Sequence, residues 1–128
     1  MKMEYELQVI IVAGPEDPRR AIAGFAMAAS ACCAGTKVGV YLVMDAARFV
    51  SASNCSKILA QGFPSVREFI EAIHESGGAV EYCPACLNEE CAQEVKQHVV
   101  ETEMCRLARP SGMSSFGMRM AQIPTVVF

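Results

Sequence analysis

The run Leu7-Gln8-Val9-Ile10-Ile11-Val12-Ala13, near the start of the chain, is almost continuously apolar. A short run of this kind, rich in β-branched side chains, is typical of a parallel strand that is covered on both faces. Gly14-Pro15 ends the run, and Asp17 and Pro18 then suit the cap and the first position of a helix. A buried strand followed at once by a helix is typical of an α/β protein.

Strand and helix signals alternate along the rest of the chain. Ser65 and Glu68 have the spacing of a capping box, which predicts that a helix begins there, and Gly77-Gly78 is suited to stop it. Residues 51–62 have no clear periodicity, and Met104–Ala108 fits a strand or a continued helix almost equally well. The expected strands are 7–13, 37–44, 79–82, 104–108 and 125–128, and the expected helical segments are 19–34, 46–50, 56–60, 66–76, 88–99 and 113–121.

This alternation predicts an α/β fold, a single three-layer α/β/α sandwich with a mainly parallel sheet of about five strands. The sequence has no internal repeat and no linker, so we expect residues 1–128 to form one domain. A chain of 128 residues is long enough to bury a core without disulfide bonds. Cys33 follows the helical spacing of Ile22 and Phe25 and is expected in that core, whereas Cys32 is expected to be partly exposed.

Composition and charge exclude several classes of protein. Apolar residues make up 52% of the chain and the mean hydropathy is +0.26, which excludes a disordered chain and favours contacts between subunits. The net charge is −3 and the basic residues are scattered, so no nucleic-acid partner is expected. No apolar run approaches the roughly 20 residues of a membrane span. Residues 1–6 lack the pattern of a signal peptide, and we expect a cytoplasmic protein.

The candidate reactive site is Cys83-Pro84-Ala85-Cys86, between an apolar segment and a segment with helical character. Cytoplasmic thiols stay reduced and seven is an odd count for a disulfide framework, so reactive, metal-binding or buried cysteines remain. Between a strand and a helix N-terminus, unpaired N–H groups and the helix dipole favour a thiolate. We expect Cys83, which is closer to the strand end, to be the nucleophile and Cys86 its partner.

Parallel α/β sheets bind their ligands at the carboxyl ends of the strands, so other residues at those ends are pocket candidates. Asp45 also fits the cap of the segment 46–50, and we favour that role over a catalytic acid. The acidic segment that begins at Gly14 lacks the glycine pattern of a phosphate loop, which excludes nucleotide binding there. The pocket candidates are Gly14, Asp45, Ser111 and Gly112.

The order of these elements and the Cys83/Cys86 pair resemble the DsrE/DsrF-like family of small sulfur-relay proteins, which includes the TusD-type sulfurtransferase subunits. The likeness covers nearly the whole chain and would make residues 1–128 one DsrE/DsrF-like domain. This chain differs from the usual sulfur-relay pattern just after the cysteines. Its segment Asn88-Glu89-Glu90 is acidic, whereas sulfur-relay members usually have small or basic residues there. The matching features are the opening strand, the Ala-rich helix 19–34, the strand that closes on Met44-Asp45, the helix before Gly77-Gly78, the strand entering Cys83, and the ending Thr125–Phe128.

The resemblance implies an α/β/α sandwich that assembles into homo- or hetero-oligomers, often trimers or hexamers. It further implies transfer of sulfane sulfur as a cysteine persulfide on Cys83, with Cys86 as a second thiol, between sulfur-donor and sulfur-acceptor proteins. No resident cofactor is implied. The resemblance does not decide whether the protein turns over as a sulfurtransferase or only carries sulfur.

Two other readings of the cysteines remain open. Cys83, Cys86 and Cys91 together with His98 or Cys105 could bind zinc or an iron–sulfur cluster, although zinc motifs usually show two separated ligand pairs. In that case the protein could be an assembly subunit without catalysis. Cys-Pro-Ala-Cys also resembles the motif of dithiol–disulfide redox proteins, but the chain ends where a thioredoxin fold needs a further strand and helix.

Overall fold

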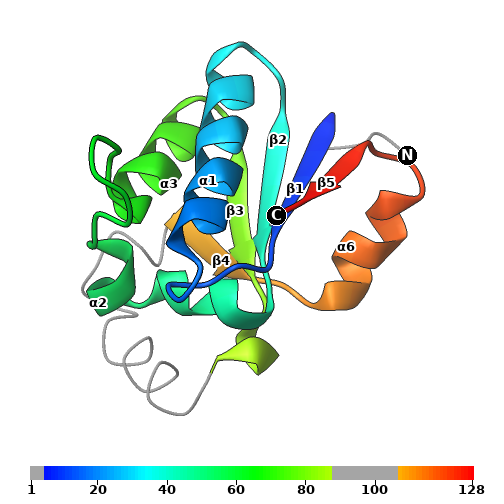
Figure 1. Cartoon of the computed structure of the whole chain (residues 1–128). Helices are drawn as coiled ribbons and strands as arrows, with labels where there is room; N and C mark the ends of the chain where they lie inside the picture. Colours follow the sequence, from blue (N-terminus) through cyan, green and yellow to red (C-terminus); the bar gives the residue numbers. More distant parts are fainter. Residues whose placement is uncertain (1–4, 88–106) are drawn as a thin grey trace.

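A computed structural model describes residues 5–87 and 107–128. The described strands form one five-stranded sheet in the order β4-β3-β2-β1-β5, and all neighbouring strands are parallel. Figure 1 shows the chain, with its last strand beside its first. The strands are β1 (Leu7–Ile11), β2 (Val38–Leu42), β3 (Ala79–Tyr82), β4 (Ala108–Pro110) and β5 (Thr125–Val127).

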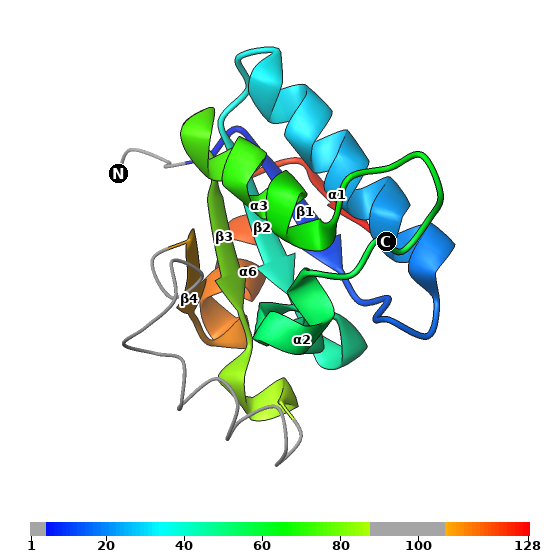
Figure 2. The same ribbon diagram turned by 90° about the vertical axis from the view of Figure 1, so that its left-hand side faces the viewer.

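Helices lie on both faces of this sheet, which confirms the predicted three-layer α/β sandwich. Helices α1 and α3 cover one face and α6 lies on the other, as the two views in Figures 1 and 2 show. No helix in the described part of the chain is long and apolar enough to cross a membrane. The helical elements are α1 (Pro18–Cys33), the 3₁₀ helix η1 (Met44–Val50), α2 (Ala52–Cys55), α3 (Val66–Glu75), the 3₁₀ helix η2 (Pro84–Cys86) and α6 (Met113–Met120).

The sheet separates two clusters of buried side chains. The larger cluster lies between the sheet and α1 and α3, where Phe25 packs edge-on against Phe49 at 5.5 Å and stacks on Phe69 at 6.4 Å between ring centroids. The smaller cluster lies on the α6 side and consists of Ile10, Tyr41, Val43, Cys83 and Phe116. The predicted nucleophile therefore belongs to the smaller core of the molecule.

Two predicted helix boundaries are confirmed. The Ser65 hydroxyl accepts a hydrogen bond from the Glu68 N–H, and the Glu68 carboxylate accepts one from the Ser65 N–H, so the capping box at the start of α3 is complete. After α3 the chain passes through Gly77 at a φ of 90°, which a glycine adopts without steric cost. Asp17 occupies the N-cap position of α1, but its side chain makes no capping hydrogen bond.

Three local predictions are wrong. Asp45 does not cap η1, because this helix begins at Met44 with Val43 as its N-cap. The helical turn after η1 is Ala52–Cys55 instead of 56–60. On α1 the buried thiol is Cys32, at 2% exposure, whereas Cys33 is exposed.

The error on α1 has a simple cause. The buried stripe of this helix contains Ala21, Phe25, Ala28 and Cys32, at intervals of three and four residues. Cys33 is one position further on, about 100° around the helix from Cys32, and therefore leaves the stripe. The helix predicted at 88–99 and most of the candidate strand 104–108 lie outside the described residues, and the observed strand β4 begins at Ala108.

Candidate functional site

Cys83 lies directly after β3, at the carboxyl edge of the sheet, as predicted. Its N–H donates to the Leu42 carbonyl at 2.9 Å, which continues the parallel pairing of β3 with β2. Pro84 then opens η2, and the Cys86 N–H donates back to the Cys83 carbonyl at 3.2 Å. This tight turn brings the two thiols together. Cys83 is 3% exposed and Cys86 is half-buried on the same cluster of side chains.

Several hydrogen-bond donors converge on the sulfur of Cys83. Burial raises the pKa of this thiol, but hydrogen bonds from the Cys86 thiol and the Tyr41 hydroxyl, with those from the N–H groups of Cys86 and Ala85, outweigh burial and lower its pKa below the usual range. A thiolate at Cys83 is therefore held by two side chains and two backbone groups.

Cys86 has the opposite tendency. Burial raises the pKa of its thiol, and so do its hydrogen bond to Cys83 and the negative charge there, while a backbone hydrogen bond from Met44 lowers it. Met44 has a φ of 56°, a conformation that residues other than glycine rarely adopt, and it stands immediately beyond β2. The proton of the pair consequently stays on Cys86 while Cys83 ionises, and this favours Cys83 as the nucleophile.

Tyr41 is a part of the site that the sequence analysis did not identify. Its side chain is 2% exposed, its ring stacks on Phe116 with centroids 4.1 Å apart, and its hydroxyl donates to the Ser111 carbonyl at 2.9 Å. In the sequence Tyr41 lies within the predicted apolar strand 37–44. The available signal is that a tyrosine hydroxyl inside a buried strand needs a polar partner.

Ser111 and Gly112 are near the cysteines through their backbone. The Ser111 N–H donates to the Tyr82 carbonyl at 2.9 Å, and the Ser111 carbonyl accepts from Tyr41. Gly112 is the N-cap residue of α6 and is exposed. Of these two pocket candidates, Ser111 thus contributes a carbonyl group to the site and Gly112 starts the helix that covers it.

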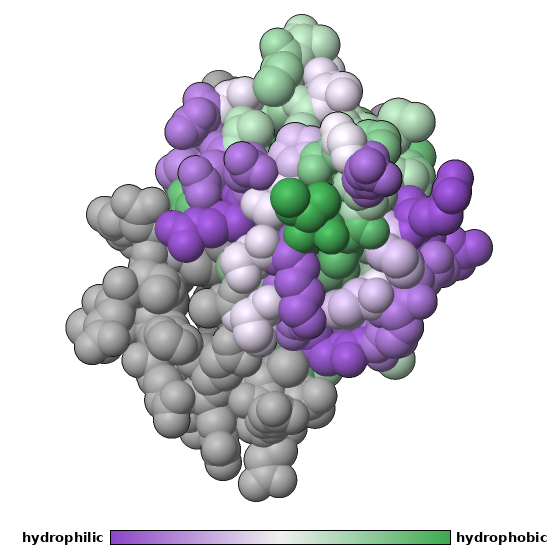
Figure 3. All heavy atoms as spheres, turned by 60° about the vertical axis from the view of Figure 1, so that its left-hand side comes forward, coloured by the Kyte–Doolittle hydropathy of each residue, from purple (hydrophilic) through white to green (hydrophobic). Residues whose placement is uncertain are grey.

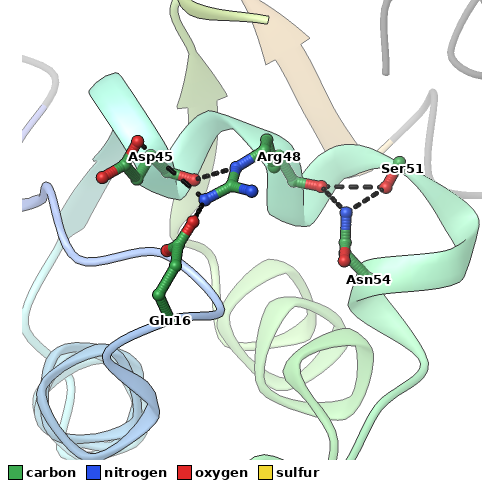
Figure 4. Close-up of polar contacts among 5 residues, drawn as sticks. All are labelled: Glu16, Asp45, Arg48, Ser51 and Asn54. Carbon is green, nitrogen blue, oxygen red and sulfur yellow. Dashed lines mark hydrogen bonds and ion pairs between the residues drawn. The ribbon is translucent and has the colours of Figure 1, made fainter. Parts of the chain in front are cut away.

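Gly14 and Asp45 form a neighbouring structure that joins the ends of β1 and β2. A Cβ atom on Gly14 would lie 2.6 Å from the Asp45 carbonyl oxygen, so only glycine fits there. Arg48 forms an ion pair with Glu16 and lies 3.9 Å from the Asp45 carboxylate, while its carbonyl accepts hydrogen bonds from Ser51 and Asn54 (Figure 4). The Asp45 carboxylate is largely exposed and lies near Arg48. The contacts of Arg48 with Glu16 and Asp45 link the loop after β1 to η1, and η1 contacts the cysteine turn η2.

Two of the cysteines in the alternative metal site, Cys83 and Cys86, are among the described residues. Cys91, His98 and Cys105 lie outside them. Within residues 5–87 and 107–128, no group of three or more histidine, cysteine, aspartate or glutamate side chains is arranged to hold a metal ion. The described cysteines, at positions 32, 33, 55, 83 and 86, form no disulfide bond with one another.

A hollow of the described surface lies elsewhere. It has a volume of about 690 Å³ and lies between α1 and residues 59–63, on the face opposite α6. Met27 and Phe63 line this hollow and are exposed, and Ile58 is exposed next to it in the chain. Figure 3 shows apolar surface at the centre of this face with polar groups around it. Cys83 and Cys86 are not part of this hollow.

Solved structures with the same fold support the architecture. The YchN protein from E. coli superposes with a TM-score of 0.70 at 9% sequence identity, covering 97% of this chain and 99% of that one. A conserved protein of unknown function, BT1422 from Bacteroides thetaiotaomicron, superposes with a TM-score of 0.60 at 12% identity, covering 96% and 95%. At such identities the likeness concerns the fold alone. No curated protein matches the sequence.

The sequence profile of the DsrE/DsrF-like family matches residues 7–123. This match includes every described helix, four of the five strands and both cysteines of the Cys-Pro-Ala-Cys turn. The five-stranded parallel sheet with helices on both faces is consistent with this match. The chain belongs to the DsrE/DsrF-like family, which is generally related to sulfur relay.

Proposed function

We propose that this protein carries sulfane sulfur as a persulfide on Cys83, with Cys86 as the second thiol, between a sulfur-donor and a sulfur-acceptor protein. The observation that carries the proposal is the convergence of the Cys86 thiol, the Tyr41 hydroxyl and two backbone N–H groups on the Cys83 sulfur. A thiolate is the reactive form of cysteine, and these donors favour it in a site that is largely closed to water.

The loading step needs no external oxidant or reductant. The Cys83 thiolate attacks the terminal sulfur of a donor persulfide, R–S–SH, and a new S–S bond forms as the S–S bond of the donor breaks. The donor leaves as the thiolate R–S⁻, and the transferred sulfur keeps its proton, so the product is Cys83–S–SH. The same donors that hold the Cys83 thiolate would hold this sulfur when it leaves again.

Delivery runs in the reverse direction with a different thiol. An acceptor thiolate attacks the terminal sulfur of Cys83–S–SH, and Cys83 leaves as a thiolate. Cys86 offers an alternative exit: once it loses its proton, its thiolate attacks the inner sulfur, expels HS⁻ and closes a Cys83–Cys86 disulfide. Burial raises the pKa of Cys86, so its thiolate is a minor form near neutral pH and this second route is disfavoured there.

We further propose that the protein is a cytoplasmic homo-oligomer, a trimer or hexamer. Large apolar side chains stand exposed on α6 and on the edge strand β5, among them Met118 at 75% and Val127 at 59%. Their burial against another copy would remove apolar surface from water. The acidic net charge favours protein partners over nucleic acid.

A cyanolysis assay tests the proposed relay. The reduced protein is incubated with a cysteine desulfurase and cysteine, separated from both, and treated with cyanide, which converts sulfane sulfur to thiocyanate. We expect about one thiocyanate per wild-type chain, none above background from Cys83→Ser, and a signal retained in Cys86→Ser. Failure of the wild-type protein to release thiocyanate would reject the relay.

A dithiol–disulfide redox role is the second candidate, because the Cys86 thiol is hydrogen-bonded to the Cys83 sulfur. In this reaction the Cys83 thiolate attacks a substrate disulfide and releases one thiol. Cys86 then releases the other and closes the Cys83–Cys86 disulfide, so the protein is oxidised by two electrons and the substrate is reduced by two. The two roles differ in their need for Cys86: Cys86→Ser abolishes turnover of a redox protein but leaves sulfur loading in place.

A further inference from the structure

Tyr41 brings a hydroxyl group into the closed core beneath α6. It stands in β2, where every residue is buried, and its ring is held parallel to that of Phe116 with an interplanar angle of 14°. The ring therefore has little freedom to turn, and the position of the hydroxyl is fixed near the carboxyl ends of β2 and β3. Only the hydroxyl hydrogen can rotate.

Two acceptors lie within reach of this hydroxyl. One is the carbonyl oxygen of Ser111, at 2.9 Å. The other is the sulfur of Cys83, which lies beside Tyr41 in the same small buried cluster and whose pKa is lowered by hydrogen bonding from this hydroxyl. A hydroxyl has one hydrogen to donate, so at any instant it serves one acceptor. A neutral thiol is a weak acceptor, whereas a thiolate is charged and a strong one.

We propose that Tyr41 is a positioning residue for the reactive sulfur, whose hydroxyl donates to the Ser111 carbonyl while Cys83 is a thiol or persulfide and turns to the Cys83 sulfur when that sulfur is a thiolate. This inference rests on the proposed sulfur relay, because it concerns the same nucleophile. The Tyr41 hydroxyl is then a neutral hydrogen-bond donor to Cys83 whenever that sulfur is charged. Only its hydrogen turns between the two acceptors, and no heavy atom moves.

The charged groups around Tyr41 keep its proton in place. Burial raises the pKa of Tyr41, and so do its hydrogen bond to Cys83 and the negative charges of Cys83, Cys86 and Glu81, so the hydroxyl remains a donor at neutral pH. On α6, Arg119 lies 3.5 Å from the Glu81 carboxylate and 5.0 Å from the centre of the Phe116 ring. The Tyr5 hydroxyl also approaches Glu81, at 3.3 Å.

The test compares Tyr41→Phe with Tyr5→Phe. Tyr41→Phe removes the hydroxyl but keeps the ring that stacks on Phe116. Tyr5→Phe is the matched control, since it removes another buried hydroxyl that reaches Glu81. The rate of iodoacetamide labelling at Cys83 is followed by peptide mass across a range of pH, with thermal unfolding as a check on folding.

Hydrogen bonds to charged groups are strong enough that losing one shifts an equilibrium by about tenfold or more. We therefore expect Tyr41→Phe to label about tenfold more slowly at neutral pH and to reach the wild-type rate at high pH, while Tyr5→Phe follows the wild-type profile. Should Tyr41→Phe fail to fold, 3-fluorotyrosine at position 41 keeps the hydroxyl as a stronger donor and should speed neutral-pH labelling.

An unchanged pH profile in Tyr41→Phe, or one altered equally in Tyr5→Phe, would overturn the role of Tyr41. If the fluorinated protein is used instead, a profile that does not move to lower pH overturns it. Sulfur loading of the wild-type protein is measured in the same preparation. The relay can therefore fail while the Tyr41 profile still shifts, and Tyr41 can fail while the relay holds.

Discussion

Cys83 is buried, yet the pKa of its thiol is lowered, and these two properties usually oppose each other. Its side chain is 3% exposed, and burial disfavours a charged sulfur. The site overcomes this because donors from two segments meet at the sulfur: Tyr41 from β2, and the Cys86 thiol and two backbone N–H groups from η2. The backbone of Met44 in turn donates a hydrogen bond to Cys86. A thiolate that is closed off from water and from oxidants, yet held by fixed donors, suits a carrier of reactive sulfur.

The lowered pKa of Cys83 also predicts how stability changes with pH. An acid whose pKa is lower in the folded protein than in the unfolded chain stabilises the fold above its unfolded pKa, and this contribution is lost as the pH falls through the folded pKa. The unfolding free energy of the wild-type protein, relative to Cys83→Ser, should therefore rise as the pH increases toward about 8.5, the usual value of a thiol.

Urea unfolding at a series of pH values, with both proteins in reductant, measures this difference. Cys33→Ser is the control, because Cys33 is exposed on α1 and far along the chain from the site. Its stability relative to the wild type should stay constant over the same range. A wild-type advantage that is flat or falls with rising pH would contradict a stabilised thiolate at Cys83.

The position of Cys83 at the sheet edge could be predicted because the strand and turn signals around it are local, and the same turn supplies some of its hydrogen-bond donors. Its role as the nucleophile stays a prediction. Tyr41 could not be found, because its contact with Cys83 joins residues on separate strands. Asp45 was misread because the chain enters η1 one residue earlier than a cap at that position requires.

Among the helices, α6 packs over the site through Phe116. Phe116 is the one buried residue of α6, and its ring stacks on that of Tyr41. Phe116→Ala would leave a cavity in the smaller core and should destabilise the protein by about 3–5 kcal/mol. It should also speed alkylation of Cys83 at high pH, where ionisation no longer limits the rate, because the cover of the sulfur is reduced.

Ser115→Ala provides the control on the same helix. Ser115 is exposed and is not one of the apolar side chains proposed to meet another copy, so its truncation should change the unfolding free energy by no more than about 0.5 kcal/mol and leave Cys83 labelling as it is. Thermal or urea unfolding and peptide mass give both readouts. Equal effects of the two substitutions would show that α6 does not protect the site through Phe116.

The capping box at the start of α3 is expected to contribute to the unfolding free energy of the protein. Ser65→Ala removes the hydroxyl that accepts from the Glu68 N–H at 3.3 Å, and it should lower the unfolding free energy by about 1 kcal/mol. Ser30→Ala, an exposed serine on α1, should stay within about 0.5 kcal/mol of the wild type. Urea unfolding distinguishes the two. A Ser65→Ala protein as stable as Ser30→Ala would mean that the cap contributes nothing.

Helix and strand positions followed from the sequence most closely where the end signals are local. β3 spans Ala79–Tyr82 as predicted, and α3 begins after Ser65. α2 was predicted less well because residues 51–62 lack periodicity. η1 was predicted less well because its position depends on the contacts of Arg48 with Glu16, in the loop after β1, and with the Asp45 carbonyl. Tertiary contacts decide such segments.

For the whole molecule, the parallel sheet accounts for the meeting of residues that are far apart in sequence. All five strands run in the same direction, so the ends of β1, β2, β3 and β4 share one edge. The alternation of strands and helices predicted this class of fold and the edge. It did not predict the strand order or the division into two cores, since both depend on which strands pair.

The exposed apolar residues of α6 and β5 predict self-association. Light scattering with size-exclusion chromatography should give a mass that is a multiple of the 13.8 kDa chain. Val127→Lys, on the edge strand, should lower that multiple while the protein stays folded, because a charge at a buried interface is costly. Lys57→Glu, a charge change on the loop after α2, should not. A wild-type protein with the mass of a single chain would reject the oligomer.

Intact mass spectrometry can show whether Cys83 carries the transferred sulfur. Wild-type protein, Cys83→Ser and Cys86→Ser are each measured before and after incubation with a cysteine desulfurase and cysteine, and again after reductant. We predict that the wild type and Cys86→Ser gain one sulfur atom that reductant removes, and that Cys83→Ser gains none. A wild-type protein without added sulfur, or equal loading of Cys83→Ser, would contradict Cys83 as the carrier.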